Sequence, residues 1–203
     1  MTNRPTVSVL LTGVGGQGVV LASYVLSHVA MAEGYEVKQS EVHGMSQRGG
    51  SVTSHFRFGD RVWSPLCTPG TVDLLLGFEA LEALRYLHWL RPGGKLVYNT
   101  LRINPSPVSA GLATYPQDVD AQIKAACPTA VPVDAHALAV KAGTGKAANV
   151  ALLGAVSLWL PFARETWEAV IAKAVPPKTV EVNLAAFRLG AENGTVALGQ
   201  EEL

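Results

Sequence analysis

The sequence predicts an α/β fold with three layers (α/β/α), a mixed and mostly parallel sheet, and a helical C-terminal part over residues 149–190. Short aliphatic runs at residues 7–11 and 72–77 are each followed by apolar residues at helical spacing and then by a further strand-like run, the pattern of βαβ units. After residue 149 only the helical period remains. The 203 residues, 48% of them hydrophobic, suffice for one domain over residues 1–203 and are short for two. The expected fold is Rossmann-like.

The first half of the chain is assigned, in order, to a strand at 7–11, a glycine turn at 13–18, a helix at 19–32 and a strand at 36–41. Gly34 is expected to end the helix. The second strand should run parallel to the first, because a helical crossover joins them. Residues 51–58 alternate between apolar and polar side chains, which predicts a half-buried strand, and the turn at residues 59–60 predicts a hairpin with residues 61–63.

The next segments are assigned to a strand at 72–77, a helix at 79–90, a break at 91–94, a strand at 95–99, a connection with room for a short edge strand at 104–116, a helix at 119–126, a strand at 130–133 and a helix at 136–142. Helices at 149–160, 164–175 and 179–189 follow, with a loosely held tail after them. The apolar run at 150–162 is too short to cross a bilayer, so it predicts a helix that is buried or docks on a partner.

Composition and charge argue against several classes of protein. Sixteen basic residues balance sixteen acidic ones and no basic run occurs, so no nucleic-acid partner is expected. No segment resembles a signal peptide or a membrane span, which predicts a cytoplasmic protein that does not contact a membrane. Cys67 and Cys127 stand alone and far apart, whereas a zinc site or an iron–sulfur cluster takes close-spaced pairs of ligands. They are expected to be small core residues.

The segment Gly13-Val-Gly-Gly-Gln-Gly18 has the Gly-x-Gly-x-x-Gly spacing between a predicted strand and a predicted helix. Such a turn brings backbone N–H groups near a phosphate or another anion, and Glu41 has the spacing of a ribose-binding acid. A tight connection with no ligand is an equal alternative. A stand-alone nucleotide-binding protein is the other alternative, either an NAD-dependent dehydrogenase or, from Leu90-Arg-Pro-Gly-Gly-Lys-Leu-Val97, a methyltransferase. Little length is left for a substrate domain, and Thr12 stands where methyltransferases usually carry an acid.

The segment Glu41-Val-His-Gly-Met-Ser-Gln-Arg-Gly-Gly50 is a poor core segment and a poor helix, because it combines adjacent glycines with hydrogen-bonding and charged groups. It is predicted to be a loop that meets a ligand or a partner. Since it follows a strand, it should emerge at the same edge of the sheet as the glycine turn. His43 is interpreted as a hydrogen-bond anchor in preference to a proton relay.

Several motifs together resemble one family: Gly13-Val-Gly-Gly-Gln-Gly-Val-Val20, Ser40-Glu-Val-His-Gly-Met-Ser-Gln-Arg-Gly-Gly-Ser-Val52, Ser64-Pro65, Asp73-Leu-Leu-Leu-Gly-Phe-Glu79, Glu82-Ala-Leu-Arg85, Asn149, Leu153-Gly154, Leu160-Pro161 and Glu181-Val-Asn-Leu-Ala-Ala-Phe187. The pattern is similar to the gamma-type subunits of 2-oxoacid:ferredoxin oxidoreductases. The His-Gly-Met-Ser-Gln-Arg-Gly-Gly form is most similar to the beta (small) subunits that act with indolepyruvate. The resemblance covers nearly the whole chain.

This resemblance implies a subunit of an enzyme that oxidatively decarboxylates a 2-oxoacid, an arylpyruvate such as indolepyruvate, to an acyl-CoA and passes electrons to ferredoxin. It places thiamine diphosphate, Mg²⁺ and [4Fe–4S] clusters on the large (alpha) subunit, with coenzyme A as co-substrate. The chain itself is expected to hold no cofactor, no metal and no catalytic residue, and to be inactive alone.

Two roles remain open for the glycine turn and the 41–50 loop: binding coenzyme A or substrate, or docking on the large subunit. The residues predicted to serve either role are Gly13, Gly15, Gly16, Gln17, Gly18, Glu41, His43, Ser46, Gln47, Arg48, Gly49 and Gly50.

Overall fold

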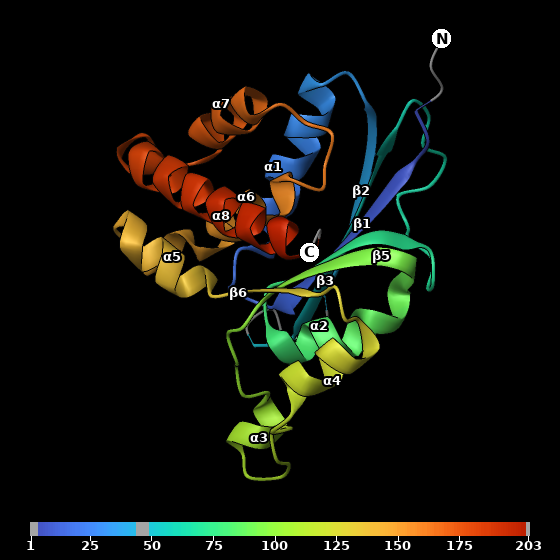
Figure 1. Cartoon of the computed structure of the whole chain (residues 1–203), viewed down its shortest axis with the longest axis vertical. Helices are drawn as coiled ribbons and strands as arrows, with labels where there is room; N and C mark the ends of the chain where they lie inside the picture. The colour runs from blue at the N-terminus through green and yellow to red at the C-terminus, as the bar shows by residue number, and fades with distance from the viewer. Residues whose placement is uncertain (1–3, 44–48, 202–203) are drawn as a thin grey trace.

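The computed structural model describes residues 4–43 and 49–201, which form a six-stranded sheet with helices on both faces (Figure 1). In spatial order the strands are β2 (Glu36–His43), β3 (Ser51–Gly59), β1 (Val7–Val14), β4 (Val72–Gly77), β5 (Leu90–Asn99) and β6 (Val131–Val133). The pairs β1/β4, β4/β5 and β5/β6 are parallel, whereas β3 is antiparallel to both β1 and β2. The predicted α/β fold with a mixed, mostly parallel sheet is confirmed.

The helices divide between the two faces of the sheet. One face packs against α1 (Val19–Ala32), α5 (Ala135–Ala142), α6 (Ala148–Ser157), α7 (Arg164–Ala174) and α8 (Val180–Glu201), and the other against α2 (Ala80–Tyr86) and α4 (Val119–Ala126). A short helix α3 (Ser106–Ser109) and single 3₁₀ turns at Leu87–Trp89, Gly145–Ala147 and Pro177–Thr179 complete the described elements. Because side chains alternate along β1, Val9 and Leu11 lie in the larger core and Leu10 in the smaller one.

The first helix has the bounds that its flanking glycines predict. Gly18 precedes α1 with a φ of 79°, and Gly34 follows it with a φ of 76°. Both values lie in the left-handed region that glycine adopts without strain. Gly34 donates its N–H to the carbonyl of Met31, so the helix ends where the sequence indicates.

The strand order corrects two expectations. β2 has the direction of β1, as predicted, but β3 lies between them, so the two strands are not neighbours. The hairpin predicted between β3 and residues 61–63 is wrong. At the end of β3, Gly59 pairs with Glu36 of β2 on one side, and on the other a Cβ at Gly59 would lie 3.0 Å from Thr6 Cα. Both sides are occupied, so residues 61–63 have no strand to pair with.

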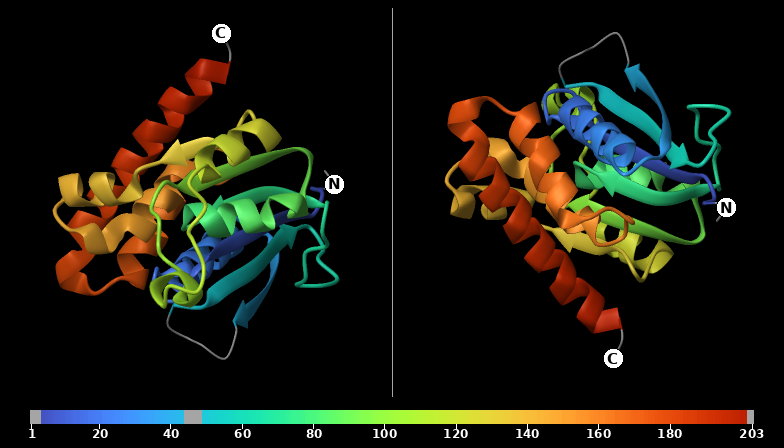
Figure 2. Two further views of the ribbon diagram at one scale, coloured as in Figure 1. Left: turned by 90° about the horizontal axis from the view of Figure 1, so that it is seen from below. Right: turned by 90° about the horizontal axis from the view of Figure 1, so that it is seen from above.

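The C-terminal segment also differs from the prediction. The sequence indicated a helix ending at residue 189 and a loose tail, yet α8 continues to Glu201, and both views of Figure 2 show its last part extending beyond the body of the domain. Gly190 and Gly194 lie where α8 crosses α6. A Cβ at Gly190 would lie 1.9 Å from the carbonyl oxygen of Ala151, and one at Gly154 would lie 1.9 Å from that of Phe187. These glycines let the two backbones touch.

Smaller differences concern connections. Residues 91–94, predicted as a break, belong to β5 as an irregularity opposite residue 73, because Val72 pairs with Leu90 and Leu74 with Lys95. The connection at 104–116 holds the short helix α3 and no strand. The helix expected at 149–160 is α6, which ends at Ser157, so residues 158–162 of the apolar run lie beyond it. Residues 149–156 are buried, whereas Leu158 is 40% exposed. Within the described residues, no helix is both long enough and apolar enough to cross a membrane.

The contact between α6 and α8 yields a prediction on stability. Alanine is the better helix former by roughly 1 kcal/mol, but in Gly190→Ala the new Cβ meets a backbone carbonyl that cannot rotate away. We expect the free energy of unfolding, measured with urea, to fall by about 2 kcal/mol or more. The exposed Glu192→Ala on the same helix is the control and should change little. A Gly190→Ala protein as stable as the parent would contradict this packing.

His55 yields a prediction on pH. Its side chain is 6% exposed on β3, its Nδ1 accepts the N–H of Cys67 at 3.1 Å, and burial lowers its pKa. Below the ordinary histidine pKa of about 6.5 the unfolded chain takes up a proton that the folded chain resists, so stability falls as the pH falls through this range. The slope due to this group is at most about 1.4 kcal/mol per pH unit.

The variant His55→Asn keeps an acceptor for the Cys67 N–H and cannot titrate, so its unfolding free energy should depend less on pH between about 6.5 and 5. The control is His136→Asn, at an exposed histidine. Identical pH profiles for parent and His55→Asn would show that His55 is not held neutral.

Candidate functional site

The glycine turn joins β1 to α1 at the carboxyl edge of the sheet, and several of its members are held by packing. A Cβ at Gly13 would lie 2.8 Å from Phe78 Cβ, and one at Gly18 would lie 2.4 Å from Asn149 Nδ2. The Gln17 side chain points into the protein: its Oε1 accepts the N–H of Val14 at 2.7 Å, and its Nε2 donates to the carbonyl of Phe78 at 2.8 Å. Gly13, Gln17 and Gly18 therefore shape the turn, and Gly15 and Gly16 line its surface.

The 41–50 segment returns to this same edge, as predicted. The N–H of Gly15 donates to the carbonyl of Gly50 at 2.9 Å, and the N–H of Gly49 donates to the carbonyl of Gly15 at 3.4 Å. His43 ends β2 opposite Val52 of β3. The predicted residues Ser46, Gln47 and Arg48 lie outside the described residues, which also leave the side chain of His43 undescribed.

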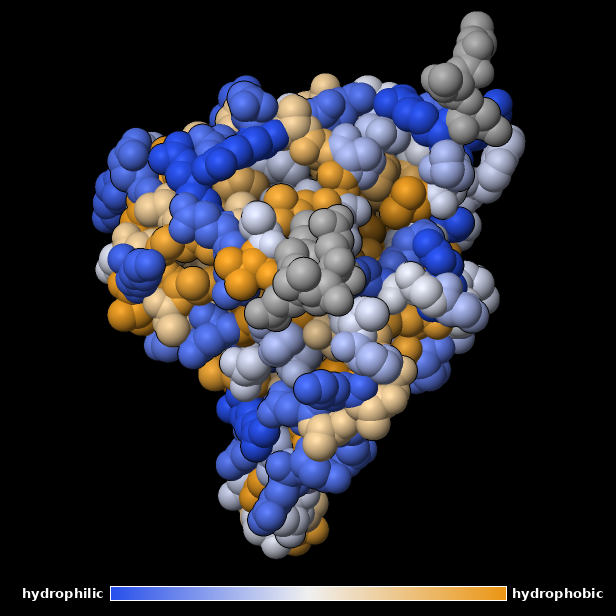
Figure 3. Space-filling model, in the orientation of Figure 1, coloured by the Kyte–Doolittle hydropathy of each residue, from blue (hydrophilic) through white to orange (hydrophobic). Residues whose placement is uncertain are grey.

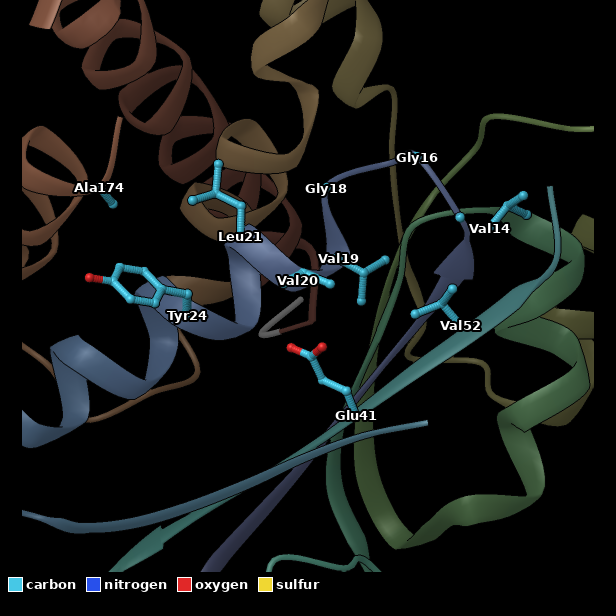
Figure 4. Close-up of a pocket in the computed structure, with 11 residues that line it drawn as sticks. Val14, Gly16, Gly18, Val19, Val20, Leu21, Tyr24, Glu41, Val52 and Ala174 are labelled. Carbon is cyan, nitrogen blue, oxygen red and sulfur yellow. The ribbon is translucent and has the colours of Figure 1, made fainter. Parts of the chain in front are cut away.

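A cavity of about 820 Å³ lies between the turn, the start of α1 and the edge strand β2 (Figure 4). Its walls are mainly apolar, with Val20, Leu21 and Tyr24 from α1. Glu41 points into it from β2 and accepts a hydrogen bond from Gln39 Nε2 at 3.0 Å. A cavity of this size and character is typical of a small-molecule site or of a groove that a partner fills.

A second cavity, of about 280 Å³, lies on the α2 side of the turn. Gly49 and Gly50 form one wall, and Glu79, Glu82 and Arg85 contribute their side chains. Glu79 is 1% exposed and Glu82 4%. In the sequence these three residues stand only as parts of motifs, and nothing local indicates that α2 meets the segment after Gly50.

A third cavity, of about 240 Å³, lies on the α6 side, at the carboxyl ends of β1, β4 and β5. Gln17, Asn99 and Asn149 line it with amide groups, and His136 and Lys146 add two basic side chains from α5 and the 3₁₀ turn before α6. No carboxylate belongs to its described lining. The sequence does not indicate this set either, since Lys146 is far from the glycine turn in the chain.

The described residues do not fit an iron–sulfur cluster or another metal. No group of three metal-ligating His, Cys, Asp or Glu side chains occurs among them. Cys67 is buried, its Sγ donates to the carbonyl of Val9 at 3.7 Å, and burial raises its pKa to about 11. Cys127 is buried at the end of α4. A thiol in such surroundings packs as a small core residue, as the sequence indicated.

The strand order also weakens the alternative of a dinucleotide-binding enzyme. In that fold, the acid that binds the ribose follows a strand next to the one that carries the glycine turn. Here β3 separates β2 from β1, so Glu41 stands one strand further away. Glu41 therefore has the sequence spacing of a ribose-binding acid, but its strand is not next to the strand that carries the glycine turn.

Comparisons with known proteins point to one family. A family model described as pyruvate ferredoxin/flavodoxin oxidoreductase matches residues 8–193. The indolepyruvate oxidoreductase subunit IorB of Thermococcus kodakarensis is 41% identical, covering 95% of this chain and 98% of its own, and that of Pyrococcus horikoshii is 42% identical, covering 91% and 94%. The crystal structure of a keto/oxoacid ferredoxin oxidoreductase gamma subunit from Geobacter sulfurreducens superposes with a TM-score of 0.69 at 25% identity, covering 94% of this chain and 99% of that one.

Proposed function

The chain belongs to the pyruvate ferredoxin/flavodoxin oxidoreductase family, and we propose that it is the small subunit of an enzyme that oxidatively decarboxylates indolepyruvate or a related arylpyruvate to an acyl-CoA. The observation that carries this proposal is identity of 41–42% to indolepyruvate oxidoreductase small subunits over nearly the full length of both chains. Electrons would pass to ferredoxin, and the complex would be cytoplasmic.

The proposal assigns the redox chemistry to the large subunit. With two cysteines, neither near the other in sequence, this chain lacks the ligands that a [4Fe–4S] cluster needs. Thiamine diphosphate, Mg²⁺ and the clusters therefore belong to the large subunit in this proposal, and residues of this chain carry out no chemical step. Its contribution is to bind and to orient.

Two of the cavities around the glycine turn suggest where this chain binds a ligand and where it meets a partner. An anion such as a coenzyme A phosphate or a substrate carboxylate is favoured on the α6 side, where His136 and Lys146 stand without a lining carboxylate. On the other side, the apolar cavity with Glu41 favours a partner surface. In this proposal Arg48 adds a guanidinium to the anion, while the neighbouring loop residues dock on the large subunit.

Exposed apolar side chains support a role inside an assembly. Trp63 is 79% exposed, Val140 54% and Val20 52%. On the face shown in Figure 3, hydrophobic residues gather around the centre of the molecule, near α6 and α8, while the region around α3 is largely hydrophilic. Such surfaces are typical of proteins that bind other proteins.

Reconstitution tests the function. The purified chain should be folded and colourless and should neither oxidise arylpyruvates nor reduce an electron acceptor. When it is combined with its large subunit, coenzyme A-dependent and indolepyruvate-dependent reduction of ferredoxin should appear, and the large subunit alone should be much less active. Turnover by the small chain on its own, or a complex that is indifferent to its presence, would contradict the proposal.

Arg48 tests the binding role. A charge-assisted hydrogen bond contributes roughly 1.5–3 kcal/mol, so Arg48→Ala should raise the apparent KM for coenzyme A or the oxoacid by about ten- to a hundredfold, with assembly nearly normal. Arg48→Lys should recover part of the loss, because an ammonium lacks the planar fork. The matched control is Arg61→Ala at the opposite edge of the sheet, where the guanidinium stacks on Trp63.

The docking role predicts a different result for the same variant. If Arg48 only pairs with an acid of the large subunit, Arg48→Ala weakens subunit association, and the kinetics are normal once the subunit is saturating. Measuring subunit affinity and KM on one protein separates the two roles. Unchanged values for both would remove Arg48 from the site.

A further inference from the structure

Helix α2 carries a buried carboxylate, that of Glu82. Glu82 is 4% exposed, and its two oxygens accept hydrogen bonds from Ser51 Oγ at 2.5 Å and from Arg85 Nε at 3.0 Å. An ionised carboxylate is costly to bury unless it is paired and hydrogen-bonded. Arg85 is half exposed and follows Glu82 on the same helix, so this ion pair lies within α2. Among the described hydrogen bonds of the Glu82 carboxylate, the one to Ser51 joins two separate parts of the chain.

Ser51 stands at the point where the glycine-rich segment rejoins the sheet. It is the first residue of β3, pairs with Val14 at the end of β1 and directly follows Gly49 and Gly50. The two glycines have no side chains with which to hold the segment, and Gly49 adopts a φ of 77°. Apart from the strand ladder, the described contacts at this junction are the two backbone bonds between Gly15 and Gly49–Gly50, and the Ser51–Glu82 bond.

We propose that Glu82 is a positioning residue for the binding edge: through the Ser51 hydroxyl it fixes the junction at which Gly15 and Gly50 meet. This inference rests on the proposed function for its consequence, because the junction matters to catalysis only if the carboxyl edge meets coenzyme A or the large subunit. The positioning itself is a property of the isolated chain.

Glu79, the N-cap residue of α2, is a second buried carboxylate whose described hydrogen bonds go elsewhere. Its Oε2 accepts the N–H of Glu82, and its Oε1 accepts the N–H of Ile103 and the hydroxyl of Tyr115. These bonds cap α2 and hold the connection after β5. Glu79 has no described bond to the glycine junction. Glu82 thus bonds to the junction, whereas the described bonds of Glu79 go to α2 and to the connection after β5, so Glu79 provides a matched control.

Amide exchange of the isolated chain, followed by NMR, tests the positioning directly. The reporter is the Gly15 N–H, which donates to Gly50 across the junction. In Ser51→Ala this amide should exchange roughly tenfold faster or more, as expected when a hydrogen bond to a charged group is lost. Glu82→Met should have a similar effect, and the double variant should add little to either single one. Ser51→Thr, which keeps the hydroxyl, should restore slow exchange.

The variant Glu79→Gln shows whether faster Gly15 exchange results from loss of the Ser51–Glu82 hydrogen bond or from a general disturbance of α2. It should leave Gly15 exchange as in the parent while it accelerates exchange at Ile103, whose N–H Glu79 holds. If Ser51→Ala leaves Gly15 exchange unchanged, or if Glu79→Gln accelerates it equally, Glu82 has no positioning role. Ser51→Ala removes one oxygen at the start of a strand, so it keeps the test valid even where Glu82→Met fails to fold.

The assembled enzyme then tests the consequence. Ser51→Ala should raise the KM for coenzyme A or the dissociation constant for the large subunit by at least severalfold while kcat is retained, and Ser51→Thr should behave as the parent. Faster Gly15 exchange with unaltered KM and subunit affinity would show that the junction does not serve the reaction. A parent chain that never assembles with a large subunit would end the proposed function, whereas the exchange result would stand.

Discussion

The pairing of β3 with β1 on one side and β2 on the other is the constraint on which the rest of the molecule depends. The segment that leaves β2 at His43 must return antiparallel as β3, so both of its ends lie at the carboxyl edge of β1. There the Gly15 N–H reaches the Gly50 carbonyl, and the two glycine-rich segments become one surface. A sheet with β2 directly beside β1 would place Glu41 on the neighbouring strand, the arrangement that binds a dinucleotide. With β3 inserted, Glu41 lies one strand further from β1.

The glycines of this chain act mostly through close packing. Gly13 and Gly18 lie against Phe78 and Asn149, and Gly154 and Gly190 let two helices meet backbone to backbone. A glycine motif read from sequence indicates that a side chain is absent, and it does not say whether a ligand or the protein itself fills the space. Here the protein fills it at Gly13 and Gly18, and open space remains at Gly16, where a Cβ would meet nothing.

Elements set by local signals could be predicted from the sequence, and elements set by distant partners could not. The helix at 19–32 was predicted with its observed bounds, because a glycine turn starts it and Gly34 ends it. The false hairpin at 61–63 arose because the partners of β3 are two other strands, one of them far back in the chain. The helix past residue 189 was missed because the glycines there pack against α6, a contact that the sequence does not show. The meeting of the two glycine-rich segments at the carboxyl edge followed from the motifs, but the position of Lys146 and the Ser51–Glu82 bond depend on tertiary contacts alone.

The charges around the turn argue that binding an anion and docking a partner need not compete for the same atoms. On the α6 side, amides and the basic side chains of His136 and Lys146 line the cavity, so an anion entering there meets donors. On the α1 side, Glu41 is the charged group in an otherwise mainly apolar described lining, which repels an anion and suits a surface with apolar groups and a cation. Gly16 of the turn lines both cavities, so the two environments lie on either side of the turn. Under the proposed function, the small subunit orients a ligand on the α6 side of the turn, while the large subunit docks on the α1 side.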